Sequence, residues 1–419
     1  MSLGGEKSFK MKLRDMENAF KYRRIPYPKR SIELIAILAI SCTFFLFMHT
    51  NKLNSRLKEM EIKLQPSEFS ALGLTGNQLN TRESSRRDNI NTLHGTYQYL
   101  KSTGQIFKLN THDLNNTVKS DIDVLVFNRV PKTGSIQMIE LMRKLGKVHN
   151  FEVEVDPQKG GIRTLLDEYE EKELVENIAS LEDGSVFVSH VNYLDFPKYG
   201  ESRPIYVNMV RDPVERVISW YYYIRSPWIF VPNRRKSNRE MPNPKWVNTE
   251  FDQCVLSGEK VCKYIEGSGM EQVGDHRRQT LFFCGHNERR CTPFNTKLPL
   301  QVAMQNVEKE YAVVGTWEDT NVTLTVLENY IPSYFRGAKN MYYMGLYKDI
   351  QNHNPMKPHI SEDIKNMVRK NFTREIEFYQ FCRQRLHKQY IALKLDELKR
   401  IDKDLQRPRD LAPHKLKRH

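Results

Sequence analysis

The feature that most constrains the fold is a repeated alternation of short apolar runs with amphipathic segments, which begins near residue 119. The apolar runs are rich in β-branched residues and are 6–8 residues long, as expected for buried strands. They are "DIDVLVF" (121–127), "VFVSHV" (186–191), "RPIYVNMV" (203–210) and "YAVVGTW" (311–317). Strands that alternate with helices predict an α/β domain, a parallel sheet flanked by helices.

The intervening helices are predicted from their apolar periodicity. They are expected over 136–146, 213–224, 319–331 and most of 360–398, with Phe378 and Phe381 packing inward in the last of these. We therefore predict one domain over 119–395, followed by a basic tail over 396–419.

The first predicted strand turns into its helix through "PKTGS", residues 131–135. Such a turn exposes backbone N–H groups at a helix start, where the helix dipole also favours an anion. Gly134 allows close approach to a ligand, Thr133 and Ser135 offer hydroxyls, and Lys132 adds a positive charge. The Walker spacing GxxxxGK[ST] is absent, so the loop is only P-loop-like, and a nucleotide kinase is disfavoured. An ordinary helix cap by Ser135 is the alternative.

A second motif, "YVNMVRDPVERVISWYYY" over 206–223, repeats the strand-to-helix arrangement. Arg211 follows the strand at the sheet edge where ligands bind in open α/β folds. Ser219 lies two helical turns further on, so the pair can hold a second anionic group. A structural ion pair of Arg211 with Asp212 or Glu215 is the alternative.

The N-terminal region predicts a membrane anchor. Residues 32–48 are almost wholly apolar, and residues 1–31 contain nine Lys or Arg and three acids, which favours a cytosolic N-terminal tail. A cleaved signal peptide and a buried helix are the alternatives. Residues 49–118 are polar and predict a luminal stem, in which Leu53, Leu57, Met60 and Leu64 form a short heptad seam or a single amphipathic turn. The net charge of 65 − 51 = +14 implies a polyanionic partner, and the anchor argues against nucleic acid.

The cysteines and glycosylation sequons agree with a luminal domain. In an oxidising compartment, the close spacings predict the disulfides Cys254–Cys262 and Cys284–Cys291, with Cys382 left over and a zinc site as the alternative. The sequons at Asn115, Asn321 and Asn371 all follow the anchor. His276 and His286, near the cysteine pairs, are interpreted as structural or solvated.

The two motifs together resemble those of the Golgi carbohydrate sulfotransferases, whose fold has a P-loop-like parallel sheet. "VSHVNYLDFPKYG" (188–200), "LFFCGH" (281–286), the stretch over 313–338 and "EIEFYQFCRQRL" (375–386) are similar to the uronyl 2-O-sulfotransferases within that family. The resemblance implies the donor 3′-phosphoadenosine 5′-phosphosulfate, no metal, and Golgi membrane localisation. It places the donor at residues from both motifs: Arg129, Lys132, Thr133, Gly134, Ser135, Arg211 and Ser219. Lys357, in "NHNPMKPHI", is a further candidate that is expected to close over the donor.

The resemblance also assigns the chemistry and the acceptor. His190 matches the catalytic base, which withdraws the proton of a sugar hydroxyl, and Lys132 stabilises the leaving phosphate oxygen. A lone histidine at a strand end is also commonly structural. The heparan-directed branch has His-Gly-His-Val where this chain has "VSHV" (188–191), which favours the chondroitin/dermatan branch.

The acceptor implied by the resemblance is a glycosaminoglycan chain, gripped by Arg234 and Arg235 in "NRRKSNR" (233–239), which is predicted to be a basic loop after the second motif, unless that run is merely solvated. The resemblance further suggests a homotrimer. A heparan sulfate 2-O-sulfotransferase and a non-catalytic glycosaminoglycan-binding protein on the same fold remain the alternatives.

Overall fold

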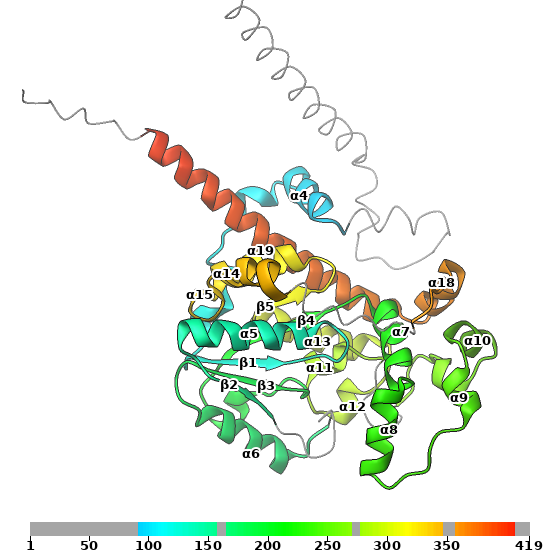
Figure 1. Ribbon diagram of the computed structural model, residues 1–419. Coiled ribbons are helices and arrows are strands. Elements are labelled where there is room, and N and C mark those ends of the chain that lie inside the picture. The colour runs from blue at the N-terminus through cyan, green and yellow to red at the C-terminus, as the bar shows by residue number, and fades with distance from the viewer. Residues whose placement is uncertain (1–90, 157–164, 270–276, 347–356, 407–419) are drawn as a thin grey trace, which may run out of the picture. The chain divides into compact units, whose positions relative to one another are not determined.

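The computed structural model describes residues 91–156, 165–269, 277–346 and 357–406 (Figure 1). The predicted tail over 1–31, the anchor over 32–48, most of the stem, His276 and residues 407–419 lie outside the described residues. Among the described helices, none is both long and apolar enough to cross a membrane.

The centre of the fold is a five-stranded, all-parallel sheet with the strand order β2-β3-β1-β4-β5. The strands are β1 (Val124–Asn128), β2 (Val153–Val155), β3 (Ser185–Ser189), β4 (Ile205–Val210) and β5 (Tyr311–Thr316). The four predicted strands are therefore confirmed. The edge strand β2 was missed because it has three residues, one of them the exposed Glu154.

Helices cover both faces of the sheet. The described α-helices are α4 (Leu93–Ser102), α5 (Ser135–His149), α6 (Glu168–Ala179), α7 (Pro213–Ile224), α8 (Pro227–Lys236), α9 (Pro244–Asn248), α10 (Phe251–Leu256), α11 (Thr280–Cys284), α12 (Glu288–Cys291), α13 (Lys297–Lys309), α14 (Thr320–Tyr330), α15 (Pro332–Phe335), α16 (Ala338–Met341), α18 (Glu362–Lys370) and α19 (Thr373–Gln406). Short 3₁₀ or π segments span Gln105–Lys108, Asn116–Lys119, Phe196–Tyr199, Lys260–Cys262 and Tyr342–Leu346.

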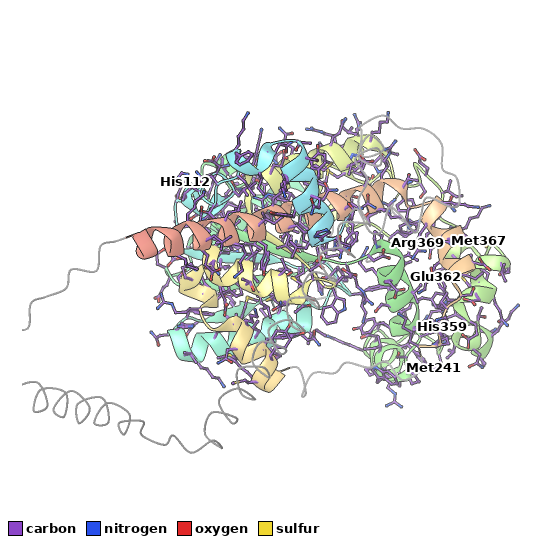
Figure 2. All side chains as sticks on the ribbon, turned by 90° about the horizontal axis from the view of Figure 1, so that it is seen from above. His112, Met241, His359, Glu362, Met367 and Arg369 are labelled. Atoms are coloured by element: carbon purple, nitrogen blue, oxygen red, sulfur yellow. A yellow bond between two sulfur atoms is a disulfide. The ribbon has the colours of Figure 1, made fainter. Side chains whose placement is uncertain are left out.

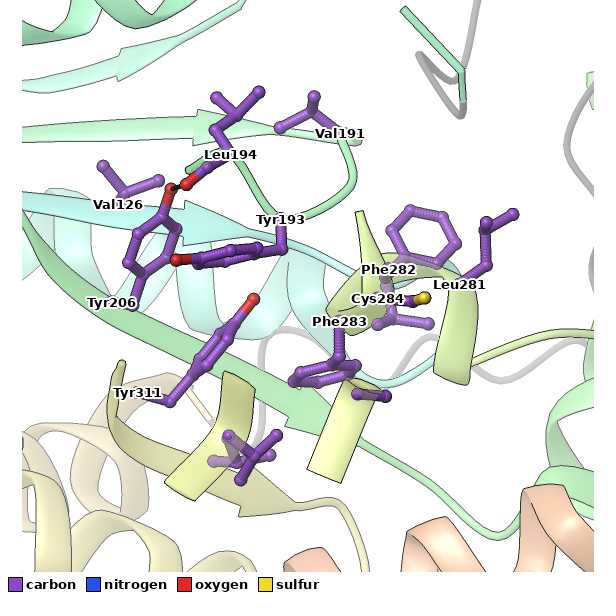
Figure 3. Packing of buried hydrophobic residues seen from close by; sticks show 14 of the residues in the cluster. Val126, Val191, Tyr193, Leu194, Tyr206, Leu281, Phe282, Phe283, Cys284 and Tyr311 are labelled. Atoms are coloured by element: carbon purple, nitrogen blue, oxygen red, sulfur yellow. Dashed lines mark hydrogen bonds between the residues drawn. The ribbon is translucent and has the colours of Figure 1, made fainter. Parts of the chain in front are cut away.

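Alternate residues of each strand enter two separate cores, as the period of two requires. One face, with Val126, Tyr206 and Tyr311, packs on α6, α11, α13 and the first part of α19. Figure 3 shows its aromatic centre, where the Tyr206 and Tyr311 rings lie 5.2 Å apart. The opposite face, with Leu125 and Val207, packs on α5, α14, α15 and Leu386 of α19. This arrangement buries every strand residue of β1, β4 and β5.

The predicted C-terminal helix is two helices. α18 ends at Lys370, and α19 starts at Thr373. The Asn295 side chain accepts a hydrogen bond from the Arg374 N–H at 2.7 Å and so caps the new helix from outside. Phe378 is fully buried and Phe381 partly buried, so the predicted inward packing is confirmed.

Ordered structure extends past the predicted domain at both ends, as packed residues before 119 and as a helix with exposed side chains over 397–401. α4, within the predicted stem, packs against α19, and the Thr96 hydroxyl lies 3.2 Å from Nδ1 of the buried His387. The Asn116 amide donates to the carbonyl of Tyr311 on β5 at 2.9 Å. At the other end, α19 continues to Gln406, past the predicted boundary at 395. The polar composition of these segments concealed packing that depends on a few buried side chains, Leu100 among them.

The structure joins Cys254 to Cys262 and Cys284 to Cys291 in disulfides, as predicted. The first links α10 to the turn at Lys260–Cys262, and the second links α11 to α12. Cys382 is a free thiol in the core, fully buried. Within the described residues, no group of three or more His, Cys, Asp and Glu side chains is arranged to hold a metal.

Candidate active site

The site is at the edge of the sheet where four neighbouring strands end. The pairing of Asn128 with Ser189 brings the last residues of β1 and β3 side by side, so Arg129 and His190 leave the sheet together. β4 ends at Val210 and β5 at Thr316, which are also paired. Arg211 and Trp317, the next residue of each strand, therefore lie at the same edge. This is the position in open α/β folds where ligands bind.

The loop between β1 and α5 has the backbone expected of an anion cradle. Lys132 and Gly134 both have positive φ, 65° and 85°. Gly134 is the N-cap of α5, and no side chain caps the helix. The alternative of an ordinary cap by Ser135 is therefore not realised. Ser135 is instead the first residue of the helix. The start of α5 thus presents backbone N–H groups and the positive end of its dipole.

The Thr133 side chain has a different role from the one expected. It is fully buried and donates its hydroxyl proton to the Val130 carbonyl at 2.9 Å. The Thr133 hydroxyl, which was predicted to donate to a ligand, therefore makes a hydrogen bond within the loop instead. Thr133 contributes to the cradle through its main chain.

Trp317 explains why the loop has a glycine at residue 134. A Cβ on Gly134 would lie 2.1 Å from Cε3 and 2.3 Å from Cζ3 of the Trp317 ring, far inside van der Waals contact. The ring, at the end of β5, thus packs directly on the loop. Sequence reasoning missed Trp317, although its position just after a buried strand places it at the ligand-binding edge.

Gly134→Ala is expected to lower the melting temperature and weaken anion binding, because the new methyl group displaces Trp317 in addition to the positive-φ cost of roughly 1 kcal/mol or more. Gly184→Ala is the matched control, since Gly184 has a φ of 83° but an open surrounding within 4 Å. Thermal unfolding of both variants separates the two costs. Equal losses of melting temperature would contradict the role given to Trp317.

His190 is held in one tautomer. Its Nδ1 lies 2.8 Å from the Arg129 carbonyl oxygen, which can only accept a hydrogen bond. Nδ1 therefore carries the proton, and the lone pair of the neutral ring is on Nε2. Burial and the nearby Arg129 guanidinium lower the pKa of His190 to about 3. The ring is thus neutral throughout the physiological range, and Nε2 keeps its lone pair.

Two cations, Arg129 and Lys132, lie in the loop between β1 and α5, and Arg129 is close enough to His190 to lower its pKa. The Lys132 ammonium lies 4.0 Å from the centroid of the Tyr223 ring, near the end of α7. Burial, then the positive charges of Arg211 and Lys357, lower the pKa of Lys132 to about 8. Burial also lowers the pKa of Arg129. A buried ammonium group whose pKa is lowered by neighbouring positive charges indicates a site that is completed by an anion.

The second motif places another positive charge, that of Arg211, directly before α7. The Arg211 guanidinium donates to the Lys132 carbonyl at 3.4 Å, which ties it to the first loop. It also lies 3.9 Å from the Glu215 carboxylate, so the predicted alternative of an Arg211–Glu215 pair is present, as a long contact. Ser219 is half-buried one turn beyond Glu215. Lys357 bonds to Glu215 at 3.1 Å and thus lies beside the same carboxylate.

Two buried charges that sequence reasoning missed support the first loop. Arg216, fully buried, donates to the Pro131 carbonyl at 3.1 Å. Glu375 of α19, also buried, accepts hydrogen bonds from the N–H of Gln279 and the side chain of Thr280 and lies close enough to Arg216 to affect its pKa. An arginine between Val214 and Val217 on an apolar helix face is a signal that could have revealed Arg216.

The predicted acceptor residues lie apart from this edge, on α8. Arg234 and Arg235 are in the last turn of that helix rather than in a loop, where they complement its dipole. Arg235 is exposed, and half-buried Arg234 donates to the Glu240 carbonyl at 2.9 Å. α8 follows α7 after two residues, and α7 ends one residue beyond Tyr223.

The remaining predicted residues fall outside the site. His286 accepts a hydrogen bond from the Leu166 N–H at 3.0 Å, and burial lowers its pKa to about 4, in keeping with a structural role. Asn321 and Asn371 are exposed. Asn115 accepts from the Thr117 N–H at 3.0 Å and caps the turn at Asn116–Lys119. Their glycosylation stays a prediction.

The family assignment follows from comparison with known proteins. The sulfotransferase family profile matches residues 115–382, which contain the whole edge described above. The chain belongs to the sulfotransferase family. It is an enzyme that transfers a sulfuryl group, and the resemblance drawn from its two motifs is confirmed.

Individual relatives refine the assignment. The chain is 43% identical to the uronyl 2-sulfotransferase homolog pip of Drosophila melanogaster, over 94% of this chain and 95% of the relative. It is 30% identical to heparan sulfate 2-O-sulfotransferase 1 of Gallus gallus, over 63% of this chain and 70% of the relative. The human heparan sulfate 2-O-sulfotransferase 1 is also 30% identical, over 62% and 69%. The chain is thus nearer to the uronyl 2-sulfotransferase relative than to the heparan sulfate enzymes.

Proposed function

We propose that this sulfotransferase moves a sulfuryl group from 3′-phosphoadenosine 5′-phosphosulfate to the 2-hydroxyl of a uronic acid in dermatan or chondroitin sulfate. The single observation that carries the proposal is the convergence of the loop over 129–134, His190 and Arg211 at one sheet edge. The donor has anionic groups at both ends, and the edge offers two adjacent positive pockets for them.

The residues present fit this donor. The start of α5 and Lys132 suit the 5′-phosphosulfate, while Arg211 and Ser219 suit the 3′-phosphate. Within the described residues, Nε of Arg129 and Nε of Arg211 are buried without a hydrogen-bond partner. A buried guanidinium N–H group without a hydrogen-bond acceptor costs free energy. An anion bound at this edge would supply the acceptors that the protein lacks there.

The reaction requires a base and a charge-stabilising group, and the geometry supplies both. The donor contributes the sulfuryl group as its bond to the 5′-phosphate oxygen breaks. Nε2 of His190 takes the proton of the acceptor hydroxyl, while the Arg129 carbonyl keeps the ring oriented through Nδ1. The Lys132 ammonium stabilises the negative charge that grows on the phosphate oxygen.

The acceptor is proposed from the charge of the chain and from its sequence similarity to known enzymes. A uronate-containing glycan is a polyanion, which suits the net charge of +14. Arg234 and Arg235 on α8 are proposed to bind it beyond the reacting sugar. The 43% identical relative bears a uronyl 2-sulfotransferase name, and "VSHV" provides one histidine where the heparan branch has two.

The cellular setting is also a proposal. We place the enzyme in the Golgi membrane as a single-pass protein with a luminal catalytic domain. The apolar run over 32–48, its basic flank, the disulfides and the sequons support this placement. A homo-oligomer, a trimer by resemblance, is proposed with it.

The function is tested by incubating the full-length protein with ³⁵S-labelled donor and with desulfated dermatan, chondroitin or heparan chains. Disaccharide analysis of the product is expected to show label at the 2-position of uronate from dermatan or chondroitin. Label in heparan alone would establish the heparan alternative. Absence of label in all three glycans would favour a non-catalytic glycosaminoglycan-binding protein.

Arg211→Ala is expected to weaken donor binding by about 10–100-fold, the loss typical of a charge-assisted, partly buried contact of roughly 1.5–3 kcal/mol. Calorimetric titration with adenosine 3′,5′-bisphosphate measures the effect. Arg374→Ala is a suitable control, because Arg374 makes its ion pair with Glu377 on α19. Unchanged affinity in Arg211→Ala would contradict its place in the donor site.

A further inference from the structure

The proposed 3′-phosphate pocket contains a carboxylate at its centre. Glu215 and Ser219 are spaced four residues apart on α7, so they lie on one side of that helix, and Arg211, two residues before the helix begins, lies 3.9 Å from the Glu215 carboxylate. A phosphate held by both Arg211 and Ser219 therefore lies over Glu215. Like charges repel at this range, so the pocket needs further cations before it can hold an anion.

A residue outside both sequence motifs supplies one of these cations. α18 lies against α7, and Nζ of Lys365 on α18 lies 2.8 Å from one oxygen of Glu215. Nζ of Lys357 lies 3.1 Å from the other oxygen. Each oxygen of the carboxylate thus has its own ammonium group, and Arg211 lies 3.9 Å from the oxygen that Lys357 contacts. Three cations surround the Glu215 carboxylate, and Glu362, a second acid in contact with Lys365, is itself paired with Arg369, so positive charge remains in excess where the phosphate belongs.

The environment of Lys365 keeps its ammonium in this place. Its side chain is only 17% exposed, and Glu362, one turn earlier on α18, lies 3.2 Å from it. Glu362 is bonded in turn to Arg369 at 3.0 Å, and Figure 2 shows both residues on this helix. The ordered helix therefore delivers Lys365 to the pocket.

The charge state of Glu215 supports the arrangement. Burial alone would raise the pKa of Glu215, but hydrogen bonds and charge interactions with Lys365 and Lys357 outweigh burial and lower the pKa to about 2. The carboxylate is therefore ionised at every physiological pH, and its negative charge cannot be removed by protonation. Neighbouring cations must offset it.

We propose that Lys365 is a further donor-binding residue that contacts the 3′-phosphate, and that Glu215 is a positioning residue that holds Arg211, Lys357 and Lys365 around it. This inference rests on the proposed donor. It extends the nucleotide site from the two sequence motifs to α18, a helix that neither motif includes.

The test separates the 3′-phosphate from the remainder of the nucleotide. Adenosine 3′,5′-bisphosphate and adenosine 5′-monophosphate are titrated calorimetrically into the full-length protein and its variants. Lys365→Met is expected to weaken bisphosphate binding at least tenfold and monophosphate binding less than twofold. Lys365→Arg should recover most of the bisphosphate affinity. Lys370→Met is the matched control, since Lys370 is exposed at the end of the same helix.

The role of Glu215 is tested by the same comparison of bisphosphate affinity with monophosphate affinity. Glu215→Gln removes a negative charge but also the group that the cations bind, so bisphosphate affinity is expected to fall severalfold with monophosphate affinity unchanged. Tighter bisphosphate binding in Glu215→Gln would overturn the positioning role.

Failure of this inference and failure of the proposed donor give different results. Equal losses for both nucleotides in Lys365→Met, or no loss for either, would overturn the contact with the 3′-phosphate while leaving the proposed donor intact. Failure of the unaltered protein to bind either nucleotide would overturn the proposed donor and this inference together.

Discussion

His190→Ala is expected to lower kcat by about 10²–10⁴-fold while changing donor affinity less than about twofold, because the ring takes a proton in the reaction and holds no part of the donor. Its Nδ1–H is bound to the Arg129 carbonyl, so only Nε2 can serve as the base. Turnover is measured with labelled donor, and affinity is measured by calorimetry with adenosine 3′,5′-bisphosphate.

Two further variants sharpen this experiment. His190→Asn retains a side-chain N–H that can reach the Arg129 carbonyl, so it keeps the orientation but removes the base, and it should be as slow as His190→Ala. His112→Ala is the control, since His112 is an exposed histidine outside the site (Figure 2). A kcat within about threefold of the unaltered enzyme for either His190 variant would show that another group accepts the proton.

The depressed pKa of His190 also sets a pH dependence. Burial and Arg129 place the pKa near 3 in the folded protein, whereas an unfolded histidine titrates near ~6.5. The unfolded state therefore binds a proton that the native state excludes, and this contribution to stability is lost progressively as the pH falls from about 6.5 towards 3. Above about 6.5 the contribution is complete. Activity should accordingly show no loss from His190 protonation between about pH 5 and pH 7.

The sequence was sufficient to predict the sheet edge because local chemistry determines it. Each of β1, β3, β4 and β5 is an apolar run that ends at a polar residue or directly before one, and parallel strands bring those ends together. The order of the strands, which makes Arg129 and His190 neighbours, depends on β1 pairing with both β3 and β4. No local pattern records that pairing.

What the sequence concealed are contacts between distant segments. Trp317 packs on Gly134, Glu375 lies beside Arg216, and Lys365 bonds to Glu215, each across more than 100 positions of the chain. Arg234 shows the converse error, since a basic run that reads as a loop forms the end of α8. Isolated charges carry no periodic signal, so their partners emerge only when packing brings the helices together.

Lys132→Ala is expected to lower kcat/KM by about 10²–10³-fold, the typical cost of losing a group that stabilises developing charge. The depressed pKa offers a more specific signature. Burial, Arg211 and Lys357 lower the pKa of Lys132 to about 8, so the free enzyme loses this charge as the pH rises through 8. The pH profile of kcat/KM should therefore fall on its alkaline side with an apparent pKa near 8.

Lys132→Arg tests whether that alkaline fall belongs to this residue. A guanidinium stays protonated to far higher pH, so the variant, although slower because its planar head group fits the loop less well, should keep its activity between about pH 8 and pH 10. Lys370→Arg, at the exposed end of α18, should retain the original profile. If kcat/KM of Lys132→Arg still falls on the alkaline side with the same apparent pKa, the titrating group is another residue. The Lys132 ammonium would then not stabilise the transition state. Since a bound dianion stabilises the protonated amine, kcat, which reports the complex, should fall at higher pH than kcat/KM does.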